Sequence, residues 1–175
     1  MQQSRLAILE MGFGTGLNAL LTFQEGQKKQ LVIDYSAVEG YPITLDQAGQ
    51  LNFVGILQDP GLENPFLEMH RCNWSEAVQL SENFRLIKWN TLFEDFEPPG
   101  KFDIVYFDAF APNAQPELWE MPLLEKMYEA LHPGGVLTTY CAKGSVKRNL
   151  KALGFTVESL EGPPGKREMT RAVKP

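Results

Sequence analysis

The sequence predicts an α/β protein with a doubly wound, mostly parallel sheet of seven strands that ends in a terminal antiparallel strand. Short apolar runs alternate along the chain with segments of helical periodicity, as in parallel sheets covered by helices on both faces. The first run, residues 6–9, leads into a glycine-rich turn and then a helix-forming segment. The last two runs flank a turn rich in glycine and proline, and we expect them to pair antiparallel.

Seven strands are expected, at residues 6–9, 31–39, 84–89, 104–107, 136–140, 156–160 and 168–173. Helical periodicity and breaker residues predict the main helices at 15–25, 116–131 and 143–153. The long connection at about 40–83 is expected to be a helical insert, with short helices at 42–56, 62–70 and 75–80. A chain of 175 residues, 1–175, is expected to form a single domain.

The composition, 43% hydrophobic and 22% charged, is that of an ordinary globular protein. No apolar run approaches the roughly 20 residues of a membrane span, and the first residues lack a signal-peptide core. Cys72 and Cys141 are isolated, and with His70 and His132 they are too sparse for a metal site. We therefore expect a cytoplasmic protein with two reduced thiols, no metal and no membrane partner. The oligomeric state is left open.

The turn after the first apolar run contains three glycines preceded by an acid, in the order Glu10-Met11-Gly12-Phe13-Gly14-Thr15-Gly16-Leu17-Asn18. Glycines allow a tight turn and bring a ligand against main-chain N–H groups. A P-loop would end in Gly-Lys-Ser/Thr, and a dinucleotide loop would read G-x-G-x-x-G, so a nicotinamide-dependent oxidoreductase is disfavoured. The spacing G-x-G-x-G after an acid matches the first motif of methyltransferases that use S-adenosylmethionine, where the acid faces the cationic end of the cofactor.

Polar residues close five of the expected strands: Glu10, Glu39, Asn90, Asp108 and Tyr140. In doubly wound sheets, ligands bind beyond the carboxyl ends of the strands. Glu39 lies 23 residues after Gly16, near the separation at which a carboxylate accepts hydrogen bonds from ribose hydroxyls. We therefore expect one ligand site along this edge of the sheet.

Four segments carry a family resemblance: residues 10–18, Phe107-Asp108-Ala109-Phe110-Ala111-Pro112, Tyr140-Cys141-Ala142-Lys143-Gly144 and Gly165-Lys166-Arg167-Glu168-Met169. From about residue 6 to about residue 173 the chain resembles the MnmD tRNA methyltransferases, which also form the N-terminal half of bifunctional MnmC proteins. The resemblance implies a Rossmann-like class I methyltransferase. It implies methyl transfer from S-adenosylmethionine to the aminomethyl group of 5-aminomethyl-2-thiouridine at the wobble position (34) of tRNA, without FAD.

The motif and the resemblance together imply a set of cofactor-binding residues, namely Glu10, Gly12, Gly14, Gly16, Asn18, Glu39, Asn90 and Asp108. Asn90 stands where an acid is usual for the adenine contact, and its amide oxygen still accepts from the adenine amino group. Asp108 is also the expected catalytic residue, because it can accept a hydrogen bond from the acceptor amine and direct the lone pair. The alternative is that Asp108 caps the following loop. Phe110 is expected to stack on the uracil ring.

The net charge is −6, yet residues 143–175 contain eight basic residues and three acidic ones. Lys143, Lys147 and Lys151 share one stripe of a predicted helix. Five residues are expected to contact phosphates of the tRNA anticodon arm, namely Lys143, Lys147, Arg148, Lys166 and Arg167. A solvated helix face and a charged hairpin would give the same pattern.

Two other functions stay open at this point. A polyamine-synthase-like aminopropyltransferase has the same architecture and also brings an amine to a sulfonium compound, but it would carry a second carboxylate pair, which is not found here. The other is a catalytically silent methyltransferase-like subunit that binds RNA or a partner. Such a subunit need not bind S-adenosylmethionine, so cofactor calorimetry separates it from an enzyme.

Overall fold

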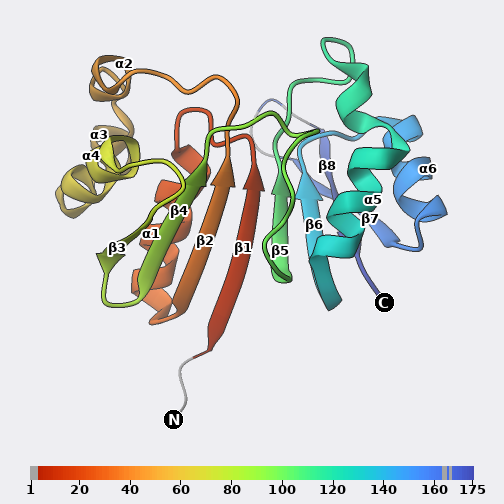
Figure 1. The fold of residues 1–175 in the computed structure, drawn as a ribbon, viewed down its shortest axis with the longest axis horizontal. Helices are drawn as coiled ribbons and strands as arrows, with labels where there is room; N and C mark the ends of the chain where they lie inside the picture. The colour runs from red at the N-terminus through yellow and green to blue at the C-terminus, as the bar shows by residue number, and fades with distance from the viewer. Residues whose placement is uncertain (1–3, 163–164, 166) are drawn as a thin grey trace.

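A computed structural model describes residues 4–162, 165 and 167–175. Within these residues, eight strands form one sheet in the order β3-β4-β2-β1-β5-β6-β8-β7 (Figure 1). The strands are β1 Arg5–Met11, β2 Val32–Val38, β3 Ala77–Ser81, β4 Phe84–Trp89, β5 Phe102–Phe107, β6 Leu131–Thr139, β7 Thr156–Glu161 and β8 Glu168–Val173. The five strands β4, β2, β1, β5 and β6 pair in parallel. Their carboxyl ends therefore lie along one edge of the sheet.

The predicted α/β sheet and its antiparallel terminal strand are confirmed, with two differences. Strand β8 is antiparallel to both β6 and β7, but it lies between them and not at the edge. The eighth strand, β3, occupies residues for which the sequence predicts a short helix, and it pairs antiparallel with β4. Val78 and Leu80 alternate with exposed residues and pack on the core, which is the period of a strand, and a two-residue turn leads directly into β4.

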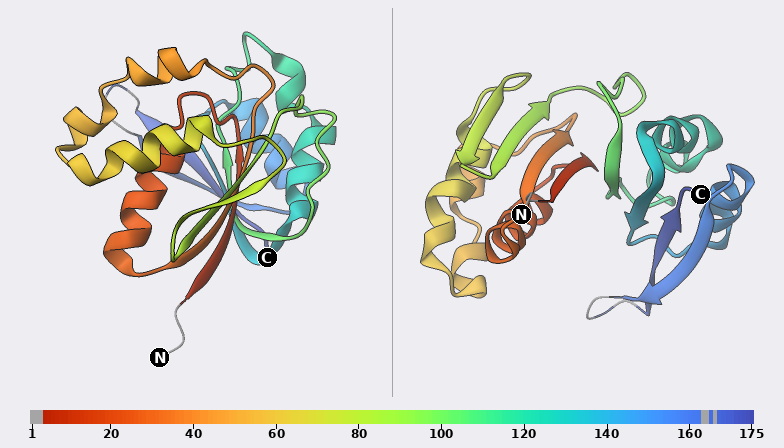
Figure 2. Two further views of the ribbon diagram at one scale, coloured as in Figure 1. Left: turned by 60° about the vertical axis from the view of Figure 1, so that its left-hand side comes forward. Right: turned by 90° about the horizontal axis from the view of Figure 1, so that it is seen from below.

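Helices cover both faces of the sheet, which gives the layered arrangement in Figure 2. They are α1 Leu17–Lys29, α2 Leu45–Gly49, α3 Phe53–Leu57, η1 Pro60–Leu62, α4 Glu63–Arg71, η2 Pro116–Trp119, α5 Met121–Ala130 and α6 Gly144–Ala152. Two predicted helices are each divided into two. The predicted helix 42–56 becomes α2 and α3, and the predicted helix 116–131 becomes η2 and α5. Pro122, which has no N–H to continue the first helix, stands at the start of α5.

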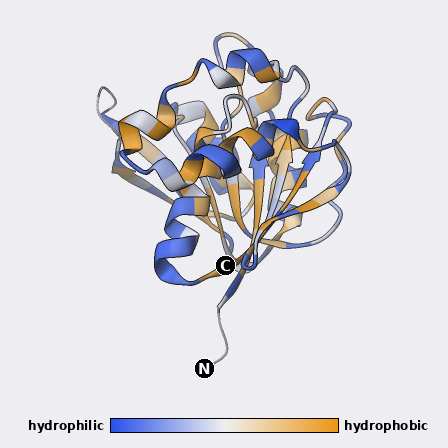
Figure 3. Ribbon diagram, turned by 90° about the vertical axis from the view of Figure 1, so that its left-hand side faces the viewer, coloured by the Kyte–Doolittle hydropathy of each residue, from blue (hydrophilic) through white to orange (hydrophobic). Residues whose placement is uncertain are grey.

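Two hydrophobic cores, one on each face, hold the layers together. Leu9 and Met11 of β1 pack with α5 and α6, whereas Ile8 packs with α1 and α4. Figure 3 shows hydrophobic residues along the strands, while the helices carry both hydrophobic and hydrophilic residues. The insert α2–α4 joins β2 to β3 and packs on the same face as α1. No helix in the described part of the chain is long and apolar enough to cross a membrane.

Candidate functional site

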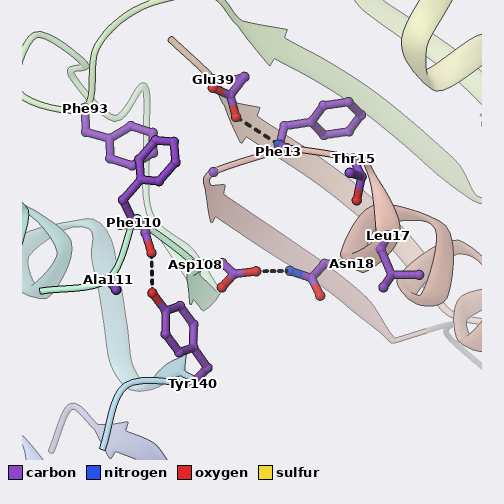
Figure 4. Close-up of a pocket in the computed structure, with 13 residues that line it drawn as sticks. Phe13, Thr15, Leu17, Asn18, Glu39, Phe93, Asp108, Phe110, Ala111 and Tyr140 are labelled. Carbon is purple, nitrogen blue, oxygen red and sulfur yellow. Dashed lines mark hydrogen bonds between the residues drawn. The ribbon is translucent and has the colours of Figure 1, made fainter. Parts of the chain in front are cut away.

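A cavity of about 420 Å³ lies at the carboxyl ends of β1, β2 and β5 (Figure 4). The glycine loop, the end of β2, the loop after β4 and the segment after β5 all contribute to it. Its lining residues are Gly12, Phe13, Gly14, Thr15, Leu17, Asn18, Glu39, Phe93, Asp108, Ala109, Phe110, Ala111 and Tyr140. The edge predicted from the strand ends therefore contains a cavity.

The glycine loop is folded tightly between β1 and α1. The amides of Gly12 and Phe13 both donate to the carbonyl of Val38, each across 3.0 Å. Gly12 has φ +105°, and a Cβ there would lie 2.6 Å from the main-chain oxygen of Asp108. Gly16, at φ +74°, is the N-cap of α1 and does not line the cavity. Only glycine fits at position 12, because both the backbone conformation and the close approach exclude a side chain.

Glu39 connects the glycine loop to the segment after β2. One of its carboxylate oxygens accepts from the amide of Gly14 and the other from the amide of Tyr41, each across 2.8 Å. The side chain lines the cavity although the residue is only 8% exposed. Each oxygen retains a lone pair for a ligand hydroxyl. Glu39 is thus held at the cavity wall by two main-chain N–H groups and keeps further acceptor capacity.

Asp108 projects into the cavity from the end of β5. Its amide donates to the carbonyl of Met11 across 3.0 Å, and one carboxylate oxygen accepts from the Asn18 amide across 3.2 Å. A second cavity of about 320 Å³ shares Asn18, Asp108 and Tyr140 with the first. Asp108 therefore stands between two spaces, one of them lined by the glycine loop.

Glu10 is placed differently from what the motif suggests. Strand alternation turns it toward α1 and Tyr35, so it is fully buried and does not line the cavity. Neither carboxylate oxygen has a hydrogen-bond partner among the described residues, and the hydroxyl of Tyr35 has none either. Burial raises the pKa of Glu10 to about 8, and the nearby carboxylates of Asp108 and Glu39 add to this rise. Glu10 therefore lies behind the cavity wall, protonated near pH 7 in the ligand-free protein.

The segment after β5 is fixed by two side chains, of which the sequence placed Tyr140 at the expected site edge and did not indicate Trp119. The hydroxyl of Tyr140 donates to the carbonyl of Ala109 across 2.8 Å, and the indole N–H of Trp119 donates to the carbonyl of Phe110 across 2.7 Å. The Phe110 side chain is left 58% exposed at the rim, beside Phe93 (Figure 4). These bonds occupy the turn carbonyls and keep Asp108 in place.

Asn90 does not line the cavity. Its side-chain amide donates to the main-chain oxygen of Glu39 across 2.9 Å. Phe93, three residues further along, lines the cavity instead. The loop after β4 therefore presents an aromatic ring where the sequence predicted a polar contact. Asn90 therefore holds the main chain at Glu39 in place through this hydrogen bond.

The predicted basic contacts divide into two kinds. Arg148 and Arg167 are exposed, and exposed Lys143 donates to the Asn113 side chain across 3.0 Å. Lys147 is partly buried and donates to Ser159 across 2.8 Å and to Glu168 across 3.0 Å. The hydrogen bond and charge of Lys147 lower the pKa of Glu168, and the two opposite charges are paired within the protein. Lys166 lies outside the described residues.

The strand order, the reversed β8, the glycine loop after β1 and the carboxylate after β2 together define the fold shared by methyltransferases that use S-adenosylmethionine. The chain belongs to the S-adenosyl-L-methionine-dependent methyltransferase family, whose model matches residues 66–175. Among the described residues, no group of three or more His, Cys, Asp or Glu could hold a metal ion.

Its relatives include proteins named tRNA 5-methylaminomethyl-2-thiouridine biosynthesis bifunctional protein MnmC. The one from Idiomarina loihiensis is 33% identical, with 93% of this chain and 28% of that protein covered. The one from Leptospira interrogans is 29% identical, with 95% and 27% covered. The crystal structure of MNMC2 from Aquifex aeolicus matches with a TM-score of 0.68 and 26% identity, covering 99% of this chain and 56% of that one. The chain thus spans about a quarter of the curated relatives' length.

Proposed function

We propose that the chain is an N-methyltransferase that transfers a methyl group from S-adenosylmethionine to the aminomethyl group of 5-aminomethyl-2-thiouridine at the wobble position (34) of tRNA. The family and the names of the MnmC relatives support this choice of reaction. The observation that carries it is the position of Asp108, whose carboxylate stands in the cavity beside the glycine loop. A reaction on tRNA implies a cytoplasmic protein.

The residues present fit the proposed cofactor. Glu39 offers carboxylate oxygens to ribose hydroxyls, and Gly12 and Gly14 line the cavity without a side chain that would fill it. Among the described residues that line the cavity there is no lysine or arginine, whereas Glu39 and Asp108 line it and Glu10 lies beneath. An acidic, partly buried cavity favours a cation. The sulfonium and amino groups of S-adenosylmethionine are cations, and the buried carboxylate of Glu10 would gain from their approach.

S-adenosylmethionine, when bound, supplies an electrophilic methyl group on sulfur. Asp108 accepts a hydrogen bond from the acceptor amine and so directs the nitrogen lone pair at the methyl group. The methyl group would leave with the electron pair of its carbon–sulfur bond kept by sulfur, so the chain's own task is to orient the amine and remove its proton. Asp108 or water then takes the proton that leaves nitrogen. Asn18 holds the carboxylate in this orientation through its 3.2 Å hydrogen bond.

The rim of the cavity suits an RNA substrate. Phe110 exposes 58% of its surface there and can stack on the uracil ring. Lys143 is bonded to the segment that follows Asp108, and Arg148 lies exposed on the same helix, α6. With Arg167, these side chains are the proposed contacts to phosphates of the anticodon arm. Lys147 is not among them, because its charge is paired with Glu168.

The proposed function is tested by incubating the protein with labelled S-adenosylmethionine and tRNA that lacks the final methyl group. Nucleoside analysis should recover the label in 5-methylaminomethyl-2-thiouridine at the wobble position. Label in a different nucleoside would contradict the proposed substrate. The alternative function is that of a catalytically silent subunit that binds RNA or a partner. Calorimetry with S-adenosylhomocysteine tests it, because such a subunit would fail to bind the cofactor product.

A further inference from the structure

The helical insert reaches the glycine loop through one side chain, His70 of α4. The Nε2 atom of His70 lies 3.2 Å from the carbonyl oxygen of Thr15. The same atom would be 3.0 Å from a Cβ placed on Gly16, so the imidazole ring is in close contact with the loop. The ring also packs between two phenylalanines, with centroids 5.2 Å from Phe13 and 5.0 Å from Phe66.

The contact fixes the tautomer of His70. A carbonyl oxygen only accepts, so the Nε2 atom must carry the proton. Burial lowers the pKa of His70 by more than the hydrogen bond to Thr15 raises it, and the charge of Lys88 lowers it further. The imidazole is therefore neutral near pH 7 and donates from Nε2 to the loop carbonyl.

Lys88 of β4 holds α4 in the position from which His70 reaches the loop. Its ammonium group donates to the main-chain oxygen of His70 across 3.2 Å, at the C-terminal end of α4, where carbonyl groups lack helical partners. Lys88 is only 1% exposed, and its ammonium lies 4.4 Å from the centroid of Trp74. No carboxylate among the described residues forms an ion pair with Lys88, and its ammonium instead meets a helix end and an aromatic face.

We propose that His70 is a positioning residue for the cofactor, which holds the glycine loop in its binding conformation and makes the insert part of the cofactor site. The inference rests on the proposed cofactor site, although not on the tRNA substrate. The Thr15 carbonyl faces His70, while Gly12, Gly14 and Thr15 line the cavity. A loop held in this way loses less conformational freedom when the ligand binds, which raises affinity.

Two substitutions separate the hydrogen bond from the packing. His70→Phe keeps an aromatic ring between Phe13 and Phe66 but removes the donor. His70→Gln restores an N–H donor without the ring. A third variant, Phe53→Leu, serves as the control, because Phe53 packs on Phe66 with centroids 5.8 Å apart and its side chain has no polar group that could bond to the loop. Its expected effect is on stability alone.

The readouts are the dissociation constant for S-adenosylhomocysteine by calorimetry, amide hydrogen exchange at residues 14–18 in the ligand-free protein, and the unfolding midpoint. His70→Phe should weaken binding about fivefold to tenfold and speed exchange in the loop, because it removes a hydrogen bond that fixes the loop. His70→Gln should recover most of the affinity. With cofactor in excess, turnover by His70→Phe should equal that of the unaltered protein, so the effect falls on KM and not on kcat.

The inference is overturned if His70→Phe binds the ligand as tightly as the unaltered protein, or if its loss of affinity is matched by Phe53→Leu at equal loss of stability. Failure of the unaltered protein to bind S-adenosylhomocysteine would overturn the proposed cofactor site and this inference together. If the unaltered protein binds S-adenosylhomocysteine and the His70 variants bind it equally tightly, this inference alone is overturned.

Discussion

Asn18 donates a hydrogen bond to Asp108 across 3.2 Å, although the two residues are 90 positions apart in the chain. The bond joins the first turn of α1 to the end of β5 and separates the cavity lined by the glycine loop from the second cavity. It orients the carboxylate on which the proposed chemistry depends. The same bond requires the glycine loop and β5 to be correctly placed, because it spans both.

Replacing Asp108 with Asn should lower turnover by about 10²-fold to 10⁴-fold, because the amide cannot take up the amine proton. The dissociation constant for S-adenosylhomocysteine should change little, since Glu39 and the glycine loop are untouched. Asn18→Ala should give a smaller loss, because the carboxylate remains but is no longer oriented. Single-turnover rates and calorimetry measure the two quantities. Near-normal turnover by Asp108→Asn would exclude Asp108 as the catalytic residue.

Gly12→Ala should be destabilising by about 1–3 kcal/mol and should abolish cofactor binding. Its Cβ would stand 2.6 Å from the main-chain oxygen of Asp108, and alanine rarely adopts φ +105°. Gly14→Ala is the matched control, because it also places alanine at a positive φ, +51°, but its Cβ would meet only the Gly12 oxygen at 3.9 Å. Denaturant unfolding measures the stability of the two variants, and calorimetry with S-adenosylhomocysteine measures their cofactor binding. Equal losses would show that the approach to Asp108 is not what requires glycine at position 12.

The buried carboxyl of Glu10 should make stability fall as pH rises. Its pKa is about 8 in the folded protein against 4.5 in the unfolded chain, so between these values the folded state binds more protons. This contribution to stability is fully present below pH 4.5 and is lost as the pH rises through about 8, by roughly 4–5 kcal/mol. Urea unfolding of the ligand-free protein from pH 5 to pH 8.5 measures this loss.

Glu10→Gln, which stays neutral, should give a flatter pH profile and exceed the unaltered protein in stability at pH 8.5. A slope that persists in Glu10→Gln would assign the pH dependence to other groups. Binding of S-adenosylmethionine should also release a proton from Glu10 near pH 7, because a cation stabilises the ionised form. S-adenosylhomocysteine lacks the sulfonium charge and should release less. Calorimetry in two buffers of different ionisation enthalpy measures the number of protons released on binding each ligand.

The basic residues of α6 should differ in their effect on tRNA binding. Lys143→Ala and Arg148→Ala should weaken binding, and each should reduce the salt slope by about 1, because one phosphate is no longer neutralised. Lys147→Ala should leave tRNA binding nearly unchanged and instead lower the unfolding midpoint, because its bonds to Ser159 and Glu168 are internal. Titrations of each variant with tRNA at several salt concentrations measure the affinity and the salt slope. A salt slope that is the same in all three variants would remove α6 from the proposed interface.

The apolar runs of the sequence predict the parallel strands and the edge at which the cavity lies, because a buried strand needs a continuous hydrophobic run. Strand β3 was not predicted from the sequence, because it is short and half exposed and its alternation of apolar and polar residues is therefore weak. The burial of Glu10 is not predictable from a motif, because only strand alternation in three dimensions decides which face it takes. The sequence also does not reveal that Lys147 is paired, because its partner Glu168 is 21 residues away and on a strand.

The structure of the protein with S-adenosylhomocysteine tests the central claim most directly. We expect the ligand in the cavity of about 420 Å³, with its ribose on the Glu39 carboxylate and its sulfur facing Asp108. A ligand bound elsewhere, with Phe13, Phe93 and Phe110 closing that cavity, would contradict it.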